Sequence, residues 1–298
     1  LTRNVTKMLS VLMVDFSCAL KLAIPIAVLS AMRESSGYHI SVKGGRFLEA
    51  VAKADTIVFD KTGTLTYATP TVAAVIPFGG HDEAEMLRLA ACLEEHYPHS
   101  MANAVVAEAK RHGLTHEEYH SQVQYVVAHG ISSMVEGKKV IIGSAHFVFE
   151  DEGCRILEGE QPKFDALPAA YSQLYLCIDG ELAAVICIHD PLRREAREAV
   201  RALHESGFAN VVMMTGDNRR TAEAVAAEVG VDAVYAEVLP EDKAAFIRQE
   251  KAKGHTVIMV GDGVNDSPAL SEADAGIAIS TGAAIAREIA DITVASED

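Results

Sequence analysis

The chain has 298 residues, 49% of them hydrophobic, and a formal net charge of −16. This length is sufficient for one large or two medium-sized domains. The negative charge argues against a nucleic-acid partner, because binding to a phosphate backbone depends on clustered Lys and Arg. The five cysteines form no C-x-x-C pair, which argues against a disulfide framework or a structural zinc site and suits a reducing compartment.

The first predicted element is an apolar segment from Leu9 to Met32, long enough to cross a bilayer as a helix. Its charged residues, Asp15 and Lys21, each cost roughly 2.5–3.5 kcal/mol at the centre of a membrane helix. They lie inside the apolar run, which does not fit a secretory signal. We therefore predict a transmembrane helix within residues 1–35 whose polar positions face other helices. That places the sequence within a longer protein; a buried core helix is the alternative.

Two stretches with different patterns follow. Residues 36–70 predict a connector, a short amphipathic helix near Phe47 and a buried strand at Thr56–Phe59. Residues 71–188 mix predicted strands and helices, and Asp179-Gly180 predicts the turn of a β-hairpin. We interpret this second stretch as a self-contained α+β insert.

From residue 189 to 298 the pattern becomes a regular alternation of helices and apolar strands, which is typical of a parallel sheet covered on both faces. The strand at Thr56–Phe59 has the same character. The predicted fold class is therefore α/β: a Rossmann-like parallel-sheet domain that is split by the insert at 71–188.

Polar, glycine-containing sequences follow three of the predicted strands: "VFDKTGT", "MMTGDN" and "VGDGVND". A fourth polar sequence, "LPEDK", opens a helix. Ligands of open parallel sheets bind beyond the carboxyl ends of the strands, so these sequences are expected to meet at one site. A site this acidic requires a cation before it admits a phosphate, and Mg²⁺ prefers carboxylate and carbonyl oxygens.

The charges of these residues suggest their roles. Asp60 is the expected nucleophile toward the terminal phosphoryl group of a nucleotide, forming an acyl phosphate. Asp262 and the carbonyl of Thr62 are the expected Mg²⁺ ligands, together with Asp60. The remaining residues are expected to stabilise the transferring phosphoryl group or to hold the loop beside it: Thr64, Thr215, Asp217, Lys243, Asn265 and Asp266.

Thr62 lies two positions after the nucleophile. A phosphatase of this design needs a general acid–base there to protonate the leaving alcohol and then to activate water. Threonine does not supply it, whereas ADP leaves without such help. The acyl phosphate on Asp60 is therefore expected to persist.

Together, "DKTGTLT", "TGD", "LPEDK" and "GDGVNDSPAL" strongly resemble the phosphorylation domain of P-type ATPases, which belong to the haloacid-dehalogenase-like superfamily. The resemblance implies that Asp60 is phosphorylated by ATP and that Asp262 and Asp266 lie in the Mg²⁺-binding loop. The branch resembled transports heavy metals and carries a Cys-Pro-Cys or Ser-Pro-Cys site in a membrane helix. Here Phe16-Ser17-Cys18 occupies that place, so Cys18 is a candidate ligand of the transported ion. Harder ions such as Mn²⁺, Fe²⁺ or Co²⁺ remain open.

The insert resembles the nucleotide-binding domain of the same branch. "LEEHYPHSMANAVV" supplies Glu94 and His99, with Ser100 in place of the usual proline, and "AHGI" supplies Gly130 and Ile131. The resemblance implies an adenine pocket at these residues, with Lys61 and Gly143 as further nucleotide contacts. By contrast, "HEEYH" at His116–His120 matches a zinc-protease string but lacks a nearby third ligand, so we interpret it as a solvated turn.

The sequence therefore predicts a metal-transporting P-type ATPase whose partners are ATP, Mg²⁺, a metal cation, the lipid bilayer and the rest of the pump. The expected location is a membrane, with the two globular domains in the cytoplasm. Without the actuator domain of the family, the chain is expected to autophosphorylate but not to transport. The alternatives are a soluble phosphatase of the superfamily, with the insert as its cap, and a non-catalytic module that acts through the insert.

Overall fold

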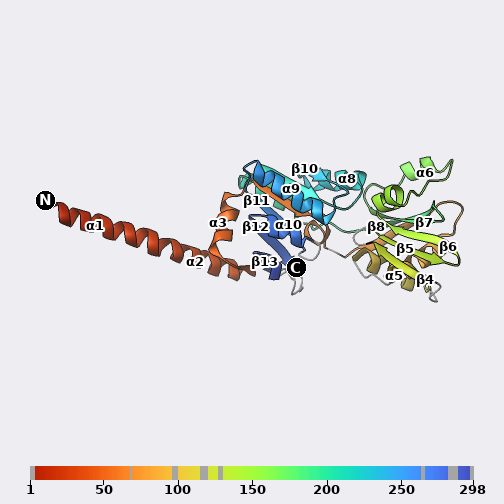
Figure 1. Cartoon of the computed structure of the whole chain (residues 1–298), viewed down its shortest axis with the longest axis horizontal. Coiled ribbons are helices and arrows are strands. Elements are labelled where there is room, and N and C mark those ends of the chain that lie inside the picture. Colours follow the sequence, from red (N-terminus) through yellow and green to blue (C-terminus); the bar gives the residue numbers. More distant parts are fainter. Residues whose placement is uncertain are drawn as a thin grey trace.

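The computed structural model describes residues 4–67, 69–95, 100–114, 120–126, 130–262, 266–280 and 288–295; of residues 12, 14–20, 120–126 and 280 it describes the backbone alone. A long helix at the N-terminus leads into a sheet domain, and a second sheet domain follows at the opposite end (Figure 1). We call the first the parallel-sheet domain and the second the antiparallel-sheet domain.

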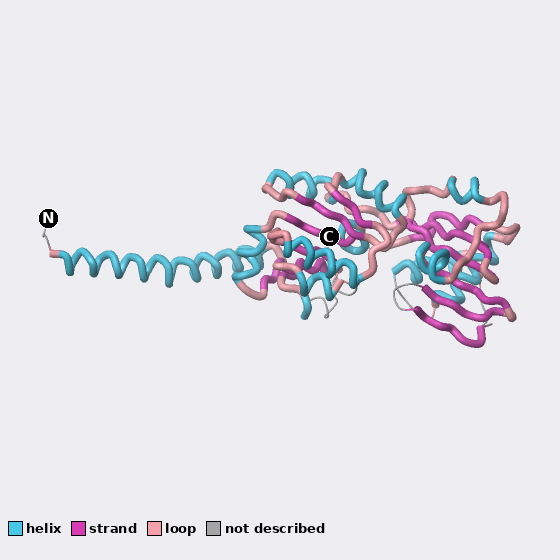
Figure 2. Tube along the Cα trace, turned by 45° about the horizontal axis from the view of Figure 1, so that its top comes forward, coloured by secondary structure: helices cyan, strands magenta, loops and turns pink. Residues whose placement is uncertain are grey.

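The N-terminal helix consists of α1 (Val5–Cys18), a π-helical turn η1 (Ala19–Ala23) and α2 (Ile24–Gly37). It projects from the parallel-sheet domain (Figure 2), and large apolar side chains such as Val11 and Leu29 are exposed along it. Within the described residues, no helix is both long and apolar enough to cross a membrane. Within the segment 9–32, where the sequence predicts a transmembrane helix, η1 lies between the two α-helices, which have 14 residues each.

The parallel-sheet domain contains a seven-stranded sheet in the order β1-β13-β12-β11-β2-β9-β10. Every pair of neighbours is parallel except β1 with β13. The strands are β1 (Ile40–Val42), β2 (Thr56–Asp60), β9 (Asn210–Met214), β10 (Ala233–Tyr235), β11 (Val257–Gly261), β12 (Ala275–Ser280) and β13 (Ile292–Ala295). The helices are α3 (Gly45–Lys53), α7 (Ala196–Glu205), α8 (Arg219–Val229), α9 (Pro240–Ala252) and α10 (Ser267–Glu272).

Apolar side chains alternate between the two faces of this sheet. Ile57 and Met213 pack on one face with residues of α7 and α8. Val58 and Met259 pack on the other face with residues of α9 and α10. Because successive side chains of a strand point to opposite faces, a strand that is covered on both sides must be apolar throughout. The predicted α/β class with a parallel sheet is therefore confirmed.

The antiparallel-sheet domain has six strands in the order β3-β8-β7-β6-β5-β4. They are β3 (Thr71–Pro77), β4 (His120–Val126), β5 (Gly130–Val135), β6 (Lys138–Gly143), β7 (Ser172–Ile178) and β8 (Glu181–His189). One apolar cluster joins this sheet to α4 (Glu83–Glu94) and α5 (Ser100–Arg111). A second cluster joins it to the π-helical turn η3 (His146–Asp151) and α6 (Gln161–Asp165).

The hairpin predicted at Asp179-Gly180 connects β7 and β8. Both turn residues have positive φ, 48° and 83°, which is the conformation that a two-residue turn needs to match the twist of its strands. Two chain segments join the domains. They run side by side, with a bridge between Thr66 and Leu192 and a hydrogen bond from Tyr67 N–H to the Pro191 carbonyl (3.1 Å).

Candidate active site at the end of strand β2

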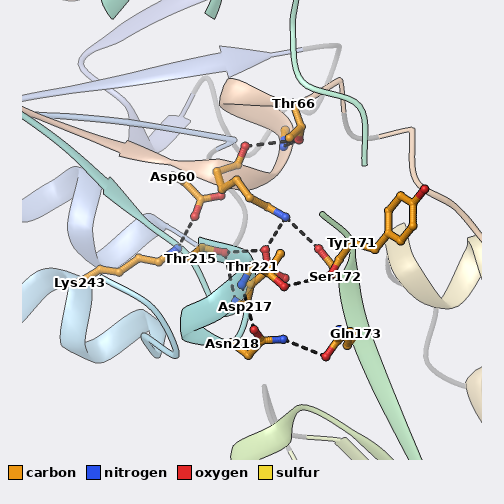
Figure 3. Close-up of polar contacts among 12 residues, drawn as sticks. Asp60, Thr66, Tyr171, Ser172, Gln173, Thr215, Asp217, Asn218, Thr221 and Lys243 are labelled. Atoms are coloured by element: carbon orange, nitrogen blue, oxygen red, sulfur yellow. Dashed lines mark hydrogen bonds and ion pairs between the residues drawn. The ribbon is translucent and has the colours of Figure 1, made fainter. Parts of the chain in front are cut away.

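Asp60 is the last residue of β2, which lies between β11 and β9 near the middle of the parallel sheet. Its carboxylate is buried and accepts a hydrogen bond at Oδ1 from Lys243 Nζ at 2.6 Å (Figure 3). Lys243 lies in the first turn of α9 and also donates to Asp266 Oδ1 at 2.7 Å. The structure therefore brings together three predicted site residues from three separate parts of the chain.

The electrostatics of this cluster are dominated by negative charge. Burial raises the pKa of the Asp60 carboxyl to about 7; the ammonium of Lys243 opposes this, whereas the carboxylates of Asp266 and Asp262 add to it. Burial alone would lower the pKa of Lys243, but Asp60 and Asp266 raise it overall, so this lysine stays protonated. Three carboxylates around one ammonium leave an excess of negative charge that a bound cation would neutralise.

The side chain of Asp266 approaches the backbone of β11 very closely at Gly261. A Cβ atom added at Gly261 would lie 2.4 Å from Asp266 Oδ2, which is closer than any real contact of that kind. Glycine is therefore required for Asp266 to reach Lys243. Asp266 Oδ2 and Thr64 Oγ1 are buried and have no hydrogen-bond partner within the described residues, and buried polar atoms of this kind are rare outside functional sites.

The loop after Asp60 turns sharply at Gly63, whose φ of 76° lies in the left-handed region. The ammonium of Lys61 contacts both domains. Its Nζ lies 2.5 Å from Asp217 Oδ2 and 3.0 Å from Ser172 Oγ. Burial lowers the pKa of Lys61, but the Asp217 carboxylate more than offsets this effect and the pKa is raised. Thr215 Oγ1 also donates to Asp217 (3.1 Å), so these predicted residues form one buried cluster beside Asp60.

The described residues of the expected adenine pocket lie in α4, β5 and β6 of the antiparallel-sheet domain. Glu94 is buried at the end of α4, and Gly130 pairs with Gly143 across β5 and β6. A Cβ atom at Gly130 would lie 2.4 Å from Phe147, so close packing already explains this glycine. Ile131 is a core residue packed with the apolar side chains of the sheet, which gives it a structural role.

Several predicted residues lie outside the described part of the structure. They are His99 and Asn265, the side chain of Cys18, and the "HEEYH" segment except for the backbone of His120, which begins β4. Within the described residues, no three His, Cys, Asp or Glu side chains are arranged as a ready metal site. The roles of the predicted site residues therefore remain predictions.

The sequence did not point to the residues through which the two domains meet. Ser172 and Gln173 begin β7 and contact Lys61 and Asn218 of the parallel-sheet domain. Asp190 lies in the second connecting segment and is partly buried, and burial raises its pKa although a hydrogen bond with Thr66 opposes the shift. No sequence signal distinguishes Ser172 or Gln173 from other strand residues, because their contacts exist only once both domains have folded.

The comparisons with known proteins agree with this geometry. Residues 54–274 match the family model of the haloacid dehalogenase-like hydrolases. The chain is 39% identical to a copper-exporting P-type ATPase of Bacillus subtilis (strain 168) over 99% of its own length, and 38% identical to a silver exporting P-type ATPase of Salmonella typhimurium over 97%. It spans 36% and 35% of those two proteins, about a third of their length.

Two solved structures extend the comparison to three dimensions. The catalytic domain of the CPx-ATPase CopB-B matches 90% of this chain and 94% of its own with a TM-score of 0.71 at 27% identity. A zinc-transporting PIB-type ATPase matches 93% of this chain and 44% of its own, with a TM-score of 0.60 at 33% identity. The resemblance inferred from the sequence motifs is thus confirmed. The chain belongs to the haloacid dehalogenase-like hydrolase family, and its relatives over almost its whole length are metal-transporting P-type ATPases.

Proposed function

We propose that this chain is the catalytic part of a pump that moves a heavy or transition metal cation across a membrane at the expense of ATP. The observation that carries this proposal is the position of Asp60 at the carboxyl end of a central parallel strand, hydrogen-bonded to a lysine that also holds Asp266. The similarity to copper- and silver-exporting ATPases supports the transport function and a membrane location, with both globular domains on the cytoplasmic side where ATP is found.

The proposed chemical step is the transfer of the terminal phosphoryl group of ATP to Asp60. A carboxylate oxygen of Asp60 attacks the γ-phosphorus, the bond to the bridging oxygen breaks, and ADP leaves. Lys243, which contacts Asp60 directly, would stabilise the negative charge on the transferring group. Thr64 has a buried hydroxyl that lacks a partner among the described residues and is therefore available to donate to the same group.

The residues present fit a magnesium ion. Asp60, Asp262 and Asp266 supply the carboxylate oxygens that this hard cation prefers, and the partnerless Oδ2 of Asp266 is a donor atom still to be used. Asp60, Asp262, Asp266 and the carbonyl of Thr62 are our proposed ligands. Bound Mg²⁺ would offset the negative charge of the phosphate oxygens and of the carboxylates around them. A nucleotide could then enter a site that otherwise carries excess negative charge. ATP itself is proposed to bind the antiparallel-sheet domain at Glu94, His99, Gly130 and Gly143.

Thr62 supports a pump over a phosphatase. It offers no carboxylate to activate water against the acyl phosphate, so the phosphorylated state should last long enough to drive a conformational change. A soluble phosphatase of the same family remains the second candidate, because the family itself is one of hydrolases. The names of the relatives, which include copper and silver, favour a soft cargo ion, and we propose Cys18 as one of its ligands.

The test is acid-quenched labelling with γ-phosphate-labelled ATP and Mg²⁺. We expect a label that hydroxylamine removes and that Asp60→Asn abolishes. Asp165→Asn is the matched control, because Asp165 is exposed and its side chain bonds only to Gln161 among the contacts of the described residues. Rapid release of phosphate without accumulation of label would instead identify a phosphatase.

A further inference from the structure

Four hydrogen bonds join the two domains on one side of their junction, and in each the parallel-sheet domain supplies the donor. They run from Lys61 Nζ to Ser172 Oγ (3.0 Å), from Asn218 Nδ2 to Gln173 Oε1 (3.1 Å), from Thr221 Oγ1 to the Tyr171 carbonyl (3.0 Å) and from Arg220 NH1 to the Asp165 carbonyl (2.7 Å). We call these eight residues the joint. All four acceptors lie within residues 165–173 of the antiparallel-sheet domain.

The donors of the joint are continuous with the candidate active site. Lys61 directly follows Asp60, and its ammonium also binds Asp217. Asn218 directly follows Asp217 and begins α8, where its Oδ1 accepts the backbone N–H of Thr221 at 3.0 Å. A shift of the antiparallel-sheet domain would therefore pull on the two loops that flank the nucleophile.

Gln173 is the most constrained side chain of the joint (Figure 3). Its Oε1 accepts from Asn218 and also from the Tyr175 hydroxyl at 2.6 Å, while its Nε2 donates to the Pro168 carbonyl at 3.1 Å. Both lone pairs of the amide oxygen are thus occupied. These three bonds fix the orientation of the amide, and with it the position of the 215–218 loop relative to β7.

The joint lies next to the two segments that connect the domains. Ser172 and Gln173 pair with Ile188 and Cys187 at the end of β8, just before the chain returns to the parallel-sheet domain. The ring of Tyr171 packs against that of His189, 5.7 Å between centroids. If the antiparallel-sheet domain rotates about the two connecting segments, contacts close to those segments move least. A small change of angle at the joint becomes a large displacement at the opposite end of the domain. The joint is therefore suited to persist while the nucleotide-binding end of the domain approaches Asp60.

We propose that Gln173 is a positioning residue for phosphoryl transfer: it holds the antiparallel-sheet domain at the angle that presents ATP to Asp60. This inference rests on the proposed function. Within the described residues, the hydrogen bonds of Gln173 go to Pro168, Tyr175 and Asn218, and none goes to Asp60 or to the expected adenine pocket. Gln173 therefore acts through the angle between the domains. Its loss should slow phosphorylation without weakening nucleotide binding.

The kinetic test compares Gln173→Ala with wild type. We expect the rate of acyl-phosphate formation to fall about fivefold to tenfold, the factor that corresponds to one lost neutral hydrogen bond, while the Kd for ATP changes less than about twofold. Asn218→Ser should act alike, because serine still caps α8 but is too short to reach Gln173. The double variant should be no slower than either single one. Gln173→Glu, which keeps the acceptor oxygen but loses the donor to the Pro168 carbonyl, should restore only part of the rate. Gln249→Ala, at an exposed position of α9, is the matched control.

The structural test does not depend on phosphorylation. Spin labels at Lys138→Cys and Arg201→Cys, both exposed and one in each domain, report the distance between the domains when Cys18 is replaced by Ser. We expect Gln173→Ala to broaden the distance distribution. If wild type forms no acyl phosphate, the proposed function fails, but this measurement still tests the joint. An unchanged distribution, or faster phosphorylation in Gln173→Ala, would overturn the inference.

Discussion

Lys243 is the single cation that the described structure places between Asp60 and Asp266, and all three side chains are buried. Removing one partner of a buried ion pair is costly because the remaining charge stays uncompensated. We expect Lys243→Met to lower the free energy of unfolding by about 3–5 kcal/mol in the absence of Mg²⁺. Urea unfolding in EDTA measures this. Asp266→Asn in the same background should recover part of the loss, and an unchanged midpoint for Lys243→Met would contradict the burial of the charges.

Gly261 is the second residue on which the site geometry depends. In Gly261→Ala the new methyl group would meet Asp266 Oδ2, so Asp266 must move away from Lys243. We expect phosphorylation to fall at least as far as in Asp266→Ala, because both changes take the carboxylate out of position. Gly37→Ala is the matched control, because Gly37 ends α2 and has open space at its Cβ. If Gly261→Ala retained full labelling, the close approach would be unnecessary for the reaction.

At the residue scale, the convergence of Asp60, Lys243 and Asp266 could be predicted because the carboxyl ends of parallel strands meet at one edge. The orientation of Lys61 could not. Its motif places it beside the nucleophile, but whether its ammonium turns to a nucleotide or to Asp217 depends on the buried charges of a loop more than 150 residues away. Ile131 shows a different limit. It was predicted to contact the nucleotide because it belongs to a motif, but an apolar residue at that position also packs in the core of its domain.

At the scale of elements, Asp232 connects α7 to the start of β9. Its Oδ2 accepts from His204 Nε2 at 2.8 Å and from the Val211 N–H at 2.7 Å. Burial raises the pKa of Asp232, but these two hydrogen bonds and the charge of His204 together lower it overall, below its usual value of 3.8. Since the folded-state pKa is depressed, the carboxylate contributes stability above about pH 4 and loses it as the pH falls through the folded-state pKa.

We therefore expect the free energy of unfolding to decline as the pH is lowered below 4, and Asp232→Asn to reduce the steepness of that decline. Asp55, whose pKa is lowered by hydrogen bonds from Thr56 and His255 against a raising effect of burial, should contribute in the same direction. Denaturant titrations between pH 3 and pH 6 measure both. Glu205→Gln is the control, because Glu205 makes only an exposed ion pair with Arg201. Identical pH profiles for Asp232→Asn and wild type would contradict the assignment.

The elements differ in how much of their local geometry the sequence reveals. The Asp179-Gly180 turn was predictable because few residues adopt positive φ at two successive positions. The sequence did not reveal the π-helical turn η1 at Ala19–Ala23, because hydropathy and length say nothing about where a helix changes its winding. A π-helical turn depends on the packing of carbonyls within the helix and leaves no distinct pattern in the sequence.

At the scale of the whole molecule, the two sheet domains have separate apolar cores. The antiparallel-sheet domain contains two clusters of its own, one on each face of its sheet. Its first and last strands are neighbours, and Thr71 pairs with His189. Because the two ends of the inserted domain are adjacent, the domain can be excised without leaving a long unpaired segment at either end. Excision removes the joint and the two connecting segments but leaves the apolar cores of the domain intact.

We therefore expect residues 70–189 to fold alone and to bind ATP with a Kd within a few-fold of that of the whole chain. Thermal unfolding and calorimetric titration with ATP measure this, and Glu94→Gln, placed in the proposed pocket, should weaken binding equally in the fragment and the chain. An unfolded fragment would mean that the joint supports the domain as well as orienting it. A folded fragment that did not bind ATP would place part of the nucleotide site on the parallel-sheet domain. Normal ATP binding by the fragment would instead show that nucleotide binding and phosphoryl transfer are assigned to different domains. The antiparallel-sheet domain would hold the nucleotide and the parallel-sheet domain would supply Asp60. The hydrogen bonds of the joint would then determine only the relative orientation of the two domains.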